Sequence, residues 1–135
     1  MFGEILAAWS LLHWQNANYK SDISFTELGP GRGTLMRDII ETVGIIGPAF
    51  FDKTPKLSAS LVEISEQFIA EQEKLLCGSV REPITPQQVF DNANYLSRVG
   101  LQKCRFKWYS LLDHVPNKRP TIYIMNEFLD ALPGP

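Results

Sequence analysis

The sequence predicts an α/β domain in which helices flank a partial parallel sheet. Short apolar segments of β type alternate with segments of helical periodicity along the chain. A glycine-rich turn at residues 27–33 joins the first predicted strand to the helix after it. A second strand and helix follow between residues 57 and 78. Such alternation is typical of βαβ units, whose strands run parallel.

The first predicted element is an amphipathic helix that runs to about Asn16, within a leading segment of residues 1–20. Apolar residues recur there at three- and four-residue steps, at Phe2, Ile5, Leu6, Trp9 and Leu12. We expect this stripe to need a packing partner. A short strand follows from Ile23 to Leu28, where the glycine cluster closes it.

The next two elements complete the first βαβ unit. Helical spacing returns after the glycine turn and is expected to end before Gly44 and Gly47. A mostly apolar run at residues 57–62 predicts a buried parallel strand that leads to Glu63. Ser65 is expected to cap the following helix, and Gly78 is expected to end it in the left-handed conformation. The inner face of that helix is predicted to hold Phe68, Ile69, Gln72, Leu75 and Leu76.

The C-terminal half of the sequence is less regular. Residues 87–99 are compatible with a short helix or with irregular chain, because prolines interrupt the pattern just before them. Phe106 and Trp108 indicate a third strand. The β-branched and aromatic residues 121–125 predict a fourth strand, which ends at residues 126–127.

Length, charge and cysteine usage narrow the function class. A chain of 135 residues fits a single domain, over residues 1–135. The formal net charge of −2 and the lack of a Lys/Arg cluster argue against nucleic-acid binding, and we expect no membrane span. Cys77 and Cys104 are far apart and lack the paired spacing of a zinc site, so we expect reduced thiols and no metal.

The glycine turn carries the clearest chemical signal. Gly29 and Gly31 can adopt backbone angles that a Cβ opposes, and Gly33 would let the next helix approach the sheet. A dinucleotide-binding turn would need glycine in place of Thr34, and the lysine of a phosphate-binding loop is missing. Glu27 precedes the glycines, and a carboxylate there suits the ammonium of a methionine moiety better than a pyrophosphate. The pattern therefore favours S-adenosylmethionine as the ligand.

A second carboxylate completes this interpretation. Glu63 ends the second predicted strand, where acidic residues of nucleotide-binding folds accept hydrogen bonds from ribose hydroxyls. In the alternative interpretation, the glycines form a tight turn and Glu27 and Glu63 are solvated strand ends.

Several segments together resemble a known family. They are residues 2–4 (Phe-Gly-Glu), 27–35 (Glu-Leu-Gly-Pro-Gly-Arg-Gly-Thr-Leu), 38–39 (Asp-Ile), 61–63 (Leu-Val-Glu) and 126–133 (Asn-Glu-Phe-Leu-Asp-Ala-Leu-Pro). The chain is similar, nearly end to end, to the MidA-type family of protein arginine methyltransferases. Eukaryotic members of that family are mitochondrial assembly factors for respiratory complex I.

The resemblance implies a Rossmann-like class I methyltransferase fold with S-adenosylmethionine as cofactor. It also implies symmetric dimethylation of an arginine on a complex I subunit, in support of complex I assembly, and a mitochondrial location, although no transit peptide is visible. Carried over by position, the cofactor-binding residues are Glu27, Gly29, Pro30, Gly31, Gly33 and Glu63. The candidate catalytic residues on the substrate side are Asn126, Glu127 and Asp130.

The candidate catalytic carboxylate has a physical role in this scheme. Glu127 could hold a substrate guanidinium by a bidentate pair and concentrate its electrons on one nitrogen. Family members extend further at both ends, so the resemblance identifies the chain as a truncated member. The alternative function is a catalytically incompetent short form that binds S-adenosylmethionine or a partner protein without turnover.

Overall fold

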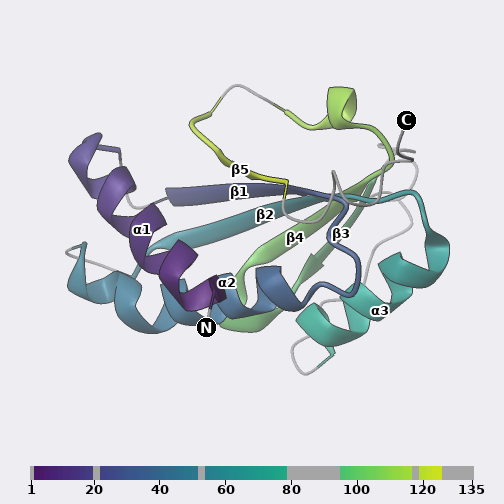
Figure 1. The fold of residues 1–135 in the computed structure, drawn as a ribbon, viewed down its shortest axis with the longest axis horizontal. Coiled ribbons are helices and arrows are strands. Elements are labelled where there is room, and N and C mark those ends of the chain that lie inside the picture. Colours follow the sequence, from purple (N-terminus) through teal and green to yellow (C-terminus); the bar gives the residue numbers. More distant parts are fainter. Residues whose placement is uncertain (1, 20–21, 52–53, 79–94, 117–118, 126–135) are drawn as a thin grey trace.

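One five-stranded sheet organises the molecule (Figure 1). A computed structural model describes residues 2–19, 22–51, 54–78, 95–116 and 119–125. The strands are β1 Asp22–Leu28, β2 Lys56–Val62, β3 Tyr95–Val99, β4 Arg105–Tyr109 and β5 Ile122–Ile124. The α-helices are α1 Phe2–Asn16, α2 Thr34–Ile46 and α3 Glu66–Cys77. Three short 3₁₀ helices are η1 Gly47–Ala49, η2 Leu101–Lys103 and η3 Leu112–His114.

The sheet is mixed, with four parallel strands and one antiparallel edge strand. β1 pairs in parallel with β2 and β5, and β2 pairs in parallel with β4, as the alternation predicted. β3 pairs antiparallel with β4. The helix considered for residues 87–99 is therefore wrong for Tyr95–Val99, while residues 87–94 lie outside the described part of the chain. The short connection through η2 explains the direction of β3, because only antiparallel neighbours can be joined so tightly.

The order of the strands places the glycine turn at a ligand-binding position. Along the sheet the order is β3-β4-β2-β1-β5. The chain moves from β1 through β2 to β4 in one direction and then returns to the other side of β1 as β5. The order of the parallel strands thus reverses at β1, and ligands of open α/β sheets bind beyond the carboxyl ends of strands at such a point.

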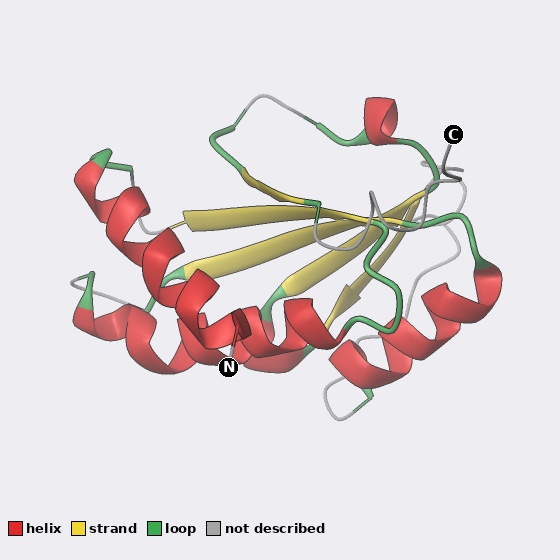
Figure 2. Ribbon diagram, viewed as in Figure 1, coloured by secondary structure: helices red, strands yellow, loops and turns green. Residues whose placement is uncertain are grey.

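Within the described residues, helices α1, α2 and α3 lie on the same side of the sheet (Figure 2). The core fills the space between them and the strands, and buried residues of the sheet alternate with partly exposed ones. In β2, Leu57, Ala59 and Leu61 are buried while Ser58 and Ser60 are half-buried. The expected apolar run is therefore buried on one face only. The helical side of the core contains Met36, Ile39, Ile40 and Val43 of α2.

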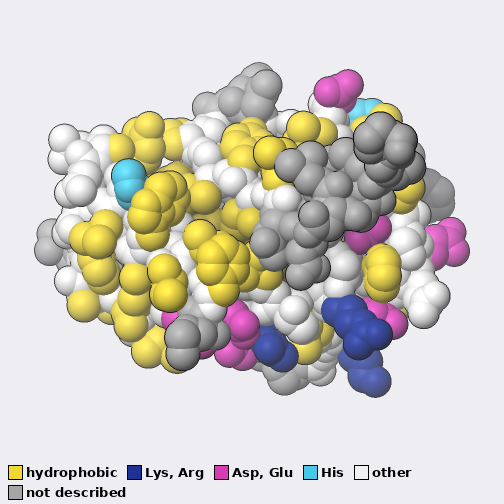
Figure 3. Space-filling view, viewed as in Figure 1, with side chains coloured by type: hydrophobic (Ala, Val, Ile, Leu, Met, Phe, Trp, Pro, Cys, Tyr) yellow, Lys and Arg dark blue, Asp and Glu magenta, His cyan; other side chains and the backbone are white. Residues whose placement is uncertain are grey.

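Helix α1 packs with a different face from the one that its apolar stripe predicted. Its buried positions are Gly3, Ala7, Ser10, Leu11 and Trp14, and its main contact is with α2. A Cβ on Gly3 would collide with the Cβ of Asp38, so glycine lets the two helices approach closely. The stripe residues Phe2, Ile5, Trp9 and Leu12 are 49–61% exposed. Figure 3 shows apolar side chains gathered on the surface where α1 lies.

Helix boundaries follow the local signals in part. The Ser65 hydroxyl accepts a hydrogen bond from the Phe68 N–H at 3.2 Å, which confirms the predicted cap of α3. Gly44 lies inside α2 and does not end it, whereas Gly47 directly follows the last residue of α2, Ile46. Gly78 has a φ of −63°, so the left-handed exit predicted there is wrong; a Cβ at this position would collide with the Lys74 carbonyl.

Two further expectations concern the thiols and the membrane. Cys77 and Cys104 are both free and fully buried, in agreement with reduced thiols. In the described helices, no segment is long and apolar enough to cross a membrane.

Candidate functional site

The glycine turn between β1 and α2 requires glycine at three positions. Gly29, Gly31 and Gly33 have φ values of 63°, 60° and 86°, in the left-handed region that side chains disfavour. The Gly29 N–H donates to the Val62 carbonyl at 3.0 Å, which fixes the start of the turn to β2. The Gly33 N–H donates to the Pro30 carbonyl at 3.0 Å and closes the turn before the helix. The glycine spacing is thus set by the backbone of this turn.

The three glycines differ in what surrounds them. A Cβ added to Gly31 would meet nothing within 4 Å, so the backbone there borders open space. A Cβ on Gly33 would lie 3.2 Å from Cγ of Gln72 in α3. Gly33 therefore permits a close approach to α3. The sequence predicted a different role, in which Gly33 lets α2 approach the sheet. Thr34 begins α2 with no side-chain cap, which leaves its first N–H groups for another acceptor.

Glu27 brings a buried carboxylate to this turn. It lies one residue before the end of β1 and is only 2% exposed. Burial of a carboxylate is costly unless a cation or hydrogen-bond donors compensate for it. A cavity of about 310 Å³ opens beside it, within the size range of small-molecule sites. Its described lining residues are Glu27, Pro30, Gly31, Arg32, Thr34, Leu35 and Phe68.

Glu63 is held in one orientation by three protein donors. Its Oε2 accepts from the N–H groups of Ile64 at 3.1 Å and Ser65 at 3.2 Å. Its Oε1 accepts from Nε2 of Gln72 at 3.1 Å. The residue is 9% exposed, and a carboxylate can accept about four hydrogen bonds, so Oε1 keeps capacity for one more donor.

The two predicted carboxylates lie at the same end of neighbouring strands. Glu27 is in register with Leu61 across the parallel pair β1 and β2, and Glu63 follows Leu61 by two residues. Side chains two residues apart on a strand share a face, so Glu27 and Glu63 are on the same face of the sheet. Strand spacing and rise place their Cα atoms roughly 8 Å apart. The structure thus brings together the two residues that the sequence singled out.

Gln72 is a polar residue of the site. Its spacing in the sequence predicted only that it lies on the inner face of α3. It is fully buried. Its Nε2 donates to the Gly31 carbonyl at 2.6 Å and to Glu63, and its Oε1 accepts from Nε1 of Trp108 at 2.9 Å. A lone amide on an otherwise apolar helix face is the signal that could have identified it.

An apolar side chain is exposed next to Glu63. Ile64 is 81% exposed, although it directly follows the carboxylate. A large aliphatic group in this position offers a surface to a flat apolar ring. Phe68, in the first turn of α3, is 38% exposed and contributes to the wall of the cavity near Glu27.

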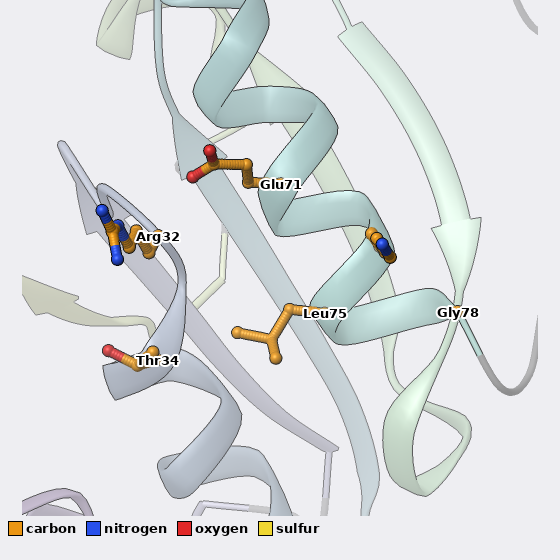
Figure 4. A pocket seen from close by; sticks show the side chains of 6 residues that line it. Arg32, Thr34, Glu71, Leu75 and Gly78 are labelled. Atoms are coloured by element: carbon orange, nitrogen blue, oxygen red, sulfur yellow. The ribbon is translucent and has the colours of Figure 1, made fainter.

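A larger cavity of about 870 Å³ lies between the start of α2 and helix α3 (Figure 4). Glu71 and Leu75 extend from α3 toward Arg32 and Thr34. Its described lining residues are Arg32, Thr34, Glu71, Lys74, Leu75 and Gly78. Arg32 and Thr34 also line the smaller cavity, but neither Glu27 nor Glu63 lines the larger one. Of the two predicted carboxylates, Glu27 is among the described lining residues of the smaller cavity and Glu63 is not.

The candidate catalytic residues are not placed by the structure. Asn126, Glu127 and Asp130 lie outside the described residues. Among the residues that are described, no three His, Cys, Asp or Glu side chains group in a way that could hold a metal ion.

Comparisons with known proteins identify the family of the chain. A family model of S-adenosyl-L-methionine-dependent methyltransferases matches residues 5–134. A Caenorhabditis elegans protein named as a mitochondrial homolog of the protein arginine methyltransferase NDUFAF7 is 33% identical over 98% of this chain and 28% of its own length. The mitochondrial NDUFAF7 proteins of Xenopus laevis and Homo sapiens are 33% and 31% identical over 98% of this chain and 29% of their own length.

The chain thus spans less than a third of the length of these curated relatives. The comparisons confirm the resemblance to arginine methyltransferases and S-adenosylmethionine as the cofactor of the family. Because the family model covers nearly all of the chain, the chain belongs to the S-adenosyl-L-methionine-dependent methyltransferase family.

Proposed function

We propose that residues 1–135 form one S-adenosylmethionine-binding domain and that the protein methylates arginine in a protein substrate. One observation carries the proposal: Glu27 near the end of β1 and Glu63 directly after the neighbouring parallel strand β2 lie beside a turn whose backbone is bare at Gly31. This arrangement offers two carboxylate acceptors and open space beside the turn.

Each part of the ligand has a matching group in this chain. Glu27 would pair with the ammonium of the methionine moiety, since a buried carboxylate favours a cationic partner. Glu63 would accept from the ribose through Oε1, which retains acceptor capacity. Gly31, together with Gly29, Pro30 and Gly33, would let the main chain contact the ligand.

Two further features support the fit. The uncapped N–H groups at the start of α2 suit the carboxylate of the methionine moiety, because a helix N-terminus favours anions. The exposed side chain of Ile64, next to Glu63, offers an apolar surface to the adenine ring.

The residues of the chain serve mainly to bind and orient. When bound, S-adenosylmethionine supplies a methyl group that is activated by its sulfonium. Positioning and exclusion of water therefore contribute most to the rate. Glu127 would hold the substrate guanidinium by a bidentate pair, with Asn126 and Asp130 on the same substrate side.

The names of the relatives support a more specific location and substrate. Their names describe mitochondrial protein arginine methyltransferases, so we propose a mitochondrial location and an arginine-bearing protein as substrate. We further propose symmetric dimethylation of an arginine on a complex I subunit, in support of complex I assembly, as the family resemblance implies. Analysis of methylated substrate for symmetric against asymmetric dimethylarginine tests this point.

Calorimetry with S-adenosylmethionine tests the cofactor site. Glu27→Gln and Glu63→Gln are each expected to weaken binding roughly 10- to 100-fold, the effect of losing one hydrogen bond to a charged group. Asp22→Asn is the matched control, because Asp22 is an exposed acid at the opposite end of the same strand as Glu27. A folded chain that ignores the ligand at millimolar concentration would contradict the proposal.

A methyl-transfer assay with an arginine-containing protein substrate tests the activity. Transfer by the chain that binds the cofactor supports the enzyme. Binding without transfer supports the alternative of a short form that holds the cofactor or a partner without turnover.

A further inference from the structure

A single side chain of α3 joins the carboxyl ends of three neighbouring strands. Gln72 contacts Gly31 in the turn after β1, Glu63 after β2 and Trp108 within β4. Both of its N–H donors and one lone pair of its oxygen are therefore used. The side chain is fully buried, so these hydrogen bonds face little competition from water.

The orientation of this amide is fixed by the chemistry of its partners. The indole N–H of Trp108 can only donate, so it must meet Oε1 of Gln72. The Gly31 carbonyl and the Glu63 carboxylate can only accept, so they must meet Nε2. A reversed amide would set oxygen against two acceptors and N–H against a donor. All three partners therefore require the same orientation, in which the amide donors of Gln72 point to the proposed ligand-binding groups.

The contacts of Gln72 act on the groups that would hold the nucleoside. The 2.6 Å hydrogen bond fixes the carbonyl of Gly31, a residue on which an added Cβ would meet no atom within 4 Å. The 3.1 Å hydrogen bond fixes Oε1 of Glu63, the oxygen with acceptor capacity to spare. The backbone of Gly33 also packs directly against the stem of Gln72. Displacement of this side chain would thus release the glycine turn and the carboxylate together.

We propose that Gln72 is a positioning residue that pre-organises the glycine turn and Glu63 for the cofactor. This inference rests on the proposed function, because it assigns Gln72 a role in binding the same ligand. A binding group that is already held in its bound orientation loses less conformational freedom when the ligand arrives. Gln72 itself need not contact the ligand.

Gln72→Met is the main test, because methionine has a similar length but cannot donate or accept in the same way. The variant is expected to bind S-adenosylhomocysteine at least 10-fold more weakly by calorimetry, at a temperature where thermal melting shows that it is folded. Gln67→Met is the matched control, since Gln67 is an exposed glutamine of the same helix. Its affinity is expected to stay within twofold.

A double-mutant cycle separates positioning from a merely structural role. If Gln72 acts through Glu63, Gln72→Met should weaken binding much less in a Glu63→Ala background than in the unmodified chain. Any remaining effect would measure the contact with Gly31. The inference would be overturned if Gln72→Met weakened binding by the same factor with and without Glu63. It would also be overturned if a folded Gln72→Met variant kept the unmodified affinity.

A second variant covers the case in which Gln72→Met does not fold. Trp108→Phe keeps Gln72 and removes the indole donor to its Oε1, together with part of a buried ring. Its affinity is expected to fall about three- to tenfold, and an unchanged affinity would reject the positioning role. If the unmodified folded chain fails to bind, the proposed function fails and this inference fails with it. If the unmodified chain binds and the variants bind equally well, only the role of Gln72 is rejected.

Discussion

Gly33 and Gln72 lie so close together that a Cβ on the glycine would stand 3.2 Å from Cγ of the glutamine. Gly33 also has a φ of 86°, which a side chain disfavours. We therefore expect Gly33→Ala to lower the free energy of unfolding by about 2–3 kcal/mol, from backbone strain and from displacement of a buried residue. Chemical denaturation measures this change.

Gly31→Ala is the matched control for that prediction. Its φ of 60° carries a similar backbone cost, but the added Cβ would meet no atom within 4 Å. The expected loss is about 1 kcal/mol. Equal losses in the two variants would show that the contact with Gln72 contributes nothing.

Gly31→Ala is also expected to weaken cofactor binding out of proportion to its effect on stability. The added methyl group would project into the open space beside the turn, where we propose that the ligand approaches the main chain. We expect an increase of at least 10-fold in the dissociation constant for S-adenosylmethionine, measured by calorimetry. An unchanged affinity would mean that the ligand does not contact the main chain at Gly31.

The sequence was sufficient to predict the elements that carry strong local patterns. β1 and β2 were predicted from short apolar segments, and the start of α3 from the Ser65 cap. Glu27 and Glu63 could be paired in advance because parallel strands end at the same edge of a sheet. These predictions depend on neighbouring residues, whose effects can be read from spacing alone.

The features that escaped prediction depend on contacts between distant segments. The apolar stripe of α1 suggested the wrong packing face, because Gly3 and its small neighbours allow a closer approach to α2 than the larger side chains do. The direction of β3 depends on pairing with β4. The role of Gln72 depends on contacts with Gly31, Glu63 and Trp108, which lie in three other segments of the chain. The sequence around Gln72 does not predict these contacts.

The close packing of α1 on α2 gives a prediction of its own. Gly3→Ala would press a methyl group against the Cβ of Asp38, close to the backbone of α2, and should lower the free energy of unfolding by about 1–3 kcal/mol. Gly44→Ala is the matched control within α2. The atoms nearest to its Cβ would be those of the exposed Gln102 side chain, which can move away, and alanine favours a helix by roughly 0.5–1 kcal/mol. Gly44→Ala should therefore change stability by less than about 1 kcal/mol.

The buried thiol of Cys104 makes stability depend on alkaline pH. Burial, reinforced by the nearby Cys77, raises the pKa of the Cys104 thiol well above its ordinary value of 9.0. Above that ordinary value, the unfolded chain loses a proton that the folded chain keeps. The free energy of unfolding contributed by this group should thus be fully present below about pH 8 and should fall as the pH rises through 9.

Urea denaturation between pH 7 and pH 10 checks this dependence, with Cys104→Ala as the reference. Burial, together with Arg105 and Arg119, lowers the pKa of Lys107 below its ordinary value of 10.5. Below that value, this group therefore makes the free energy of unfolding rise with pH, opposite to the effect of Cys104. This contribution is common to both proteins and cancels in their difference. A difference in stability that stays constant with pH would contradict the role of Cys104.

Glu127→Gln should separate cofactor binding from methyl transfer. A glutamine keeps the size of the side chain but cannot form the bidentate ion pair that we propose for the substrate guanidinium. The affinity for S-adenosylmethionine is expected to stay within about twofold, because the proposed cofactor contacts come from Glu27, Glu63 and the glycine turn. Transfer to an arginine-containing protein should fall at least 100-fold, as for an interaction that acts mainly in the transition state.

Glu63→Gln provides the converse control, since it should weaken cofactor binding first. Equal loss of binding and transfer in Glu127→Gln would instead place this carboxylate in the cofactor site and remove its assignment to the substrate.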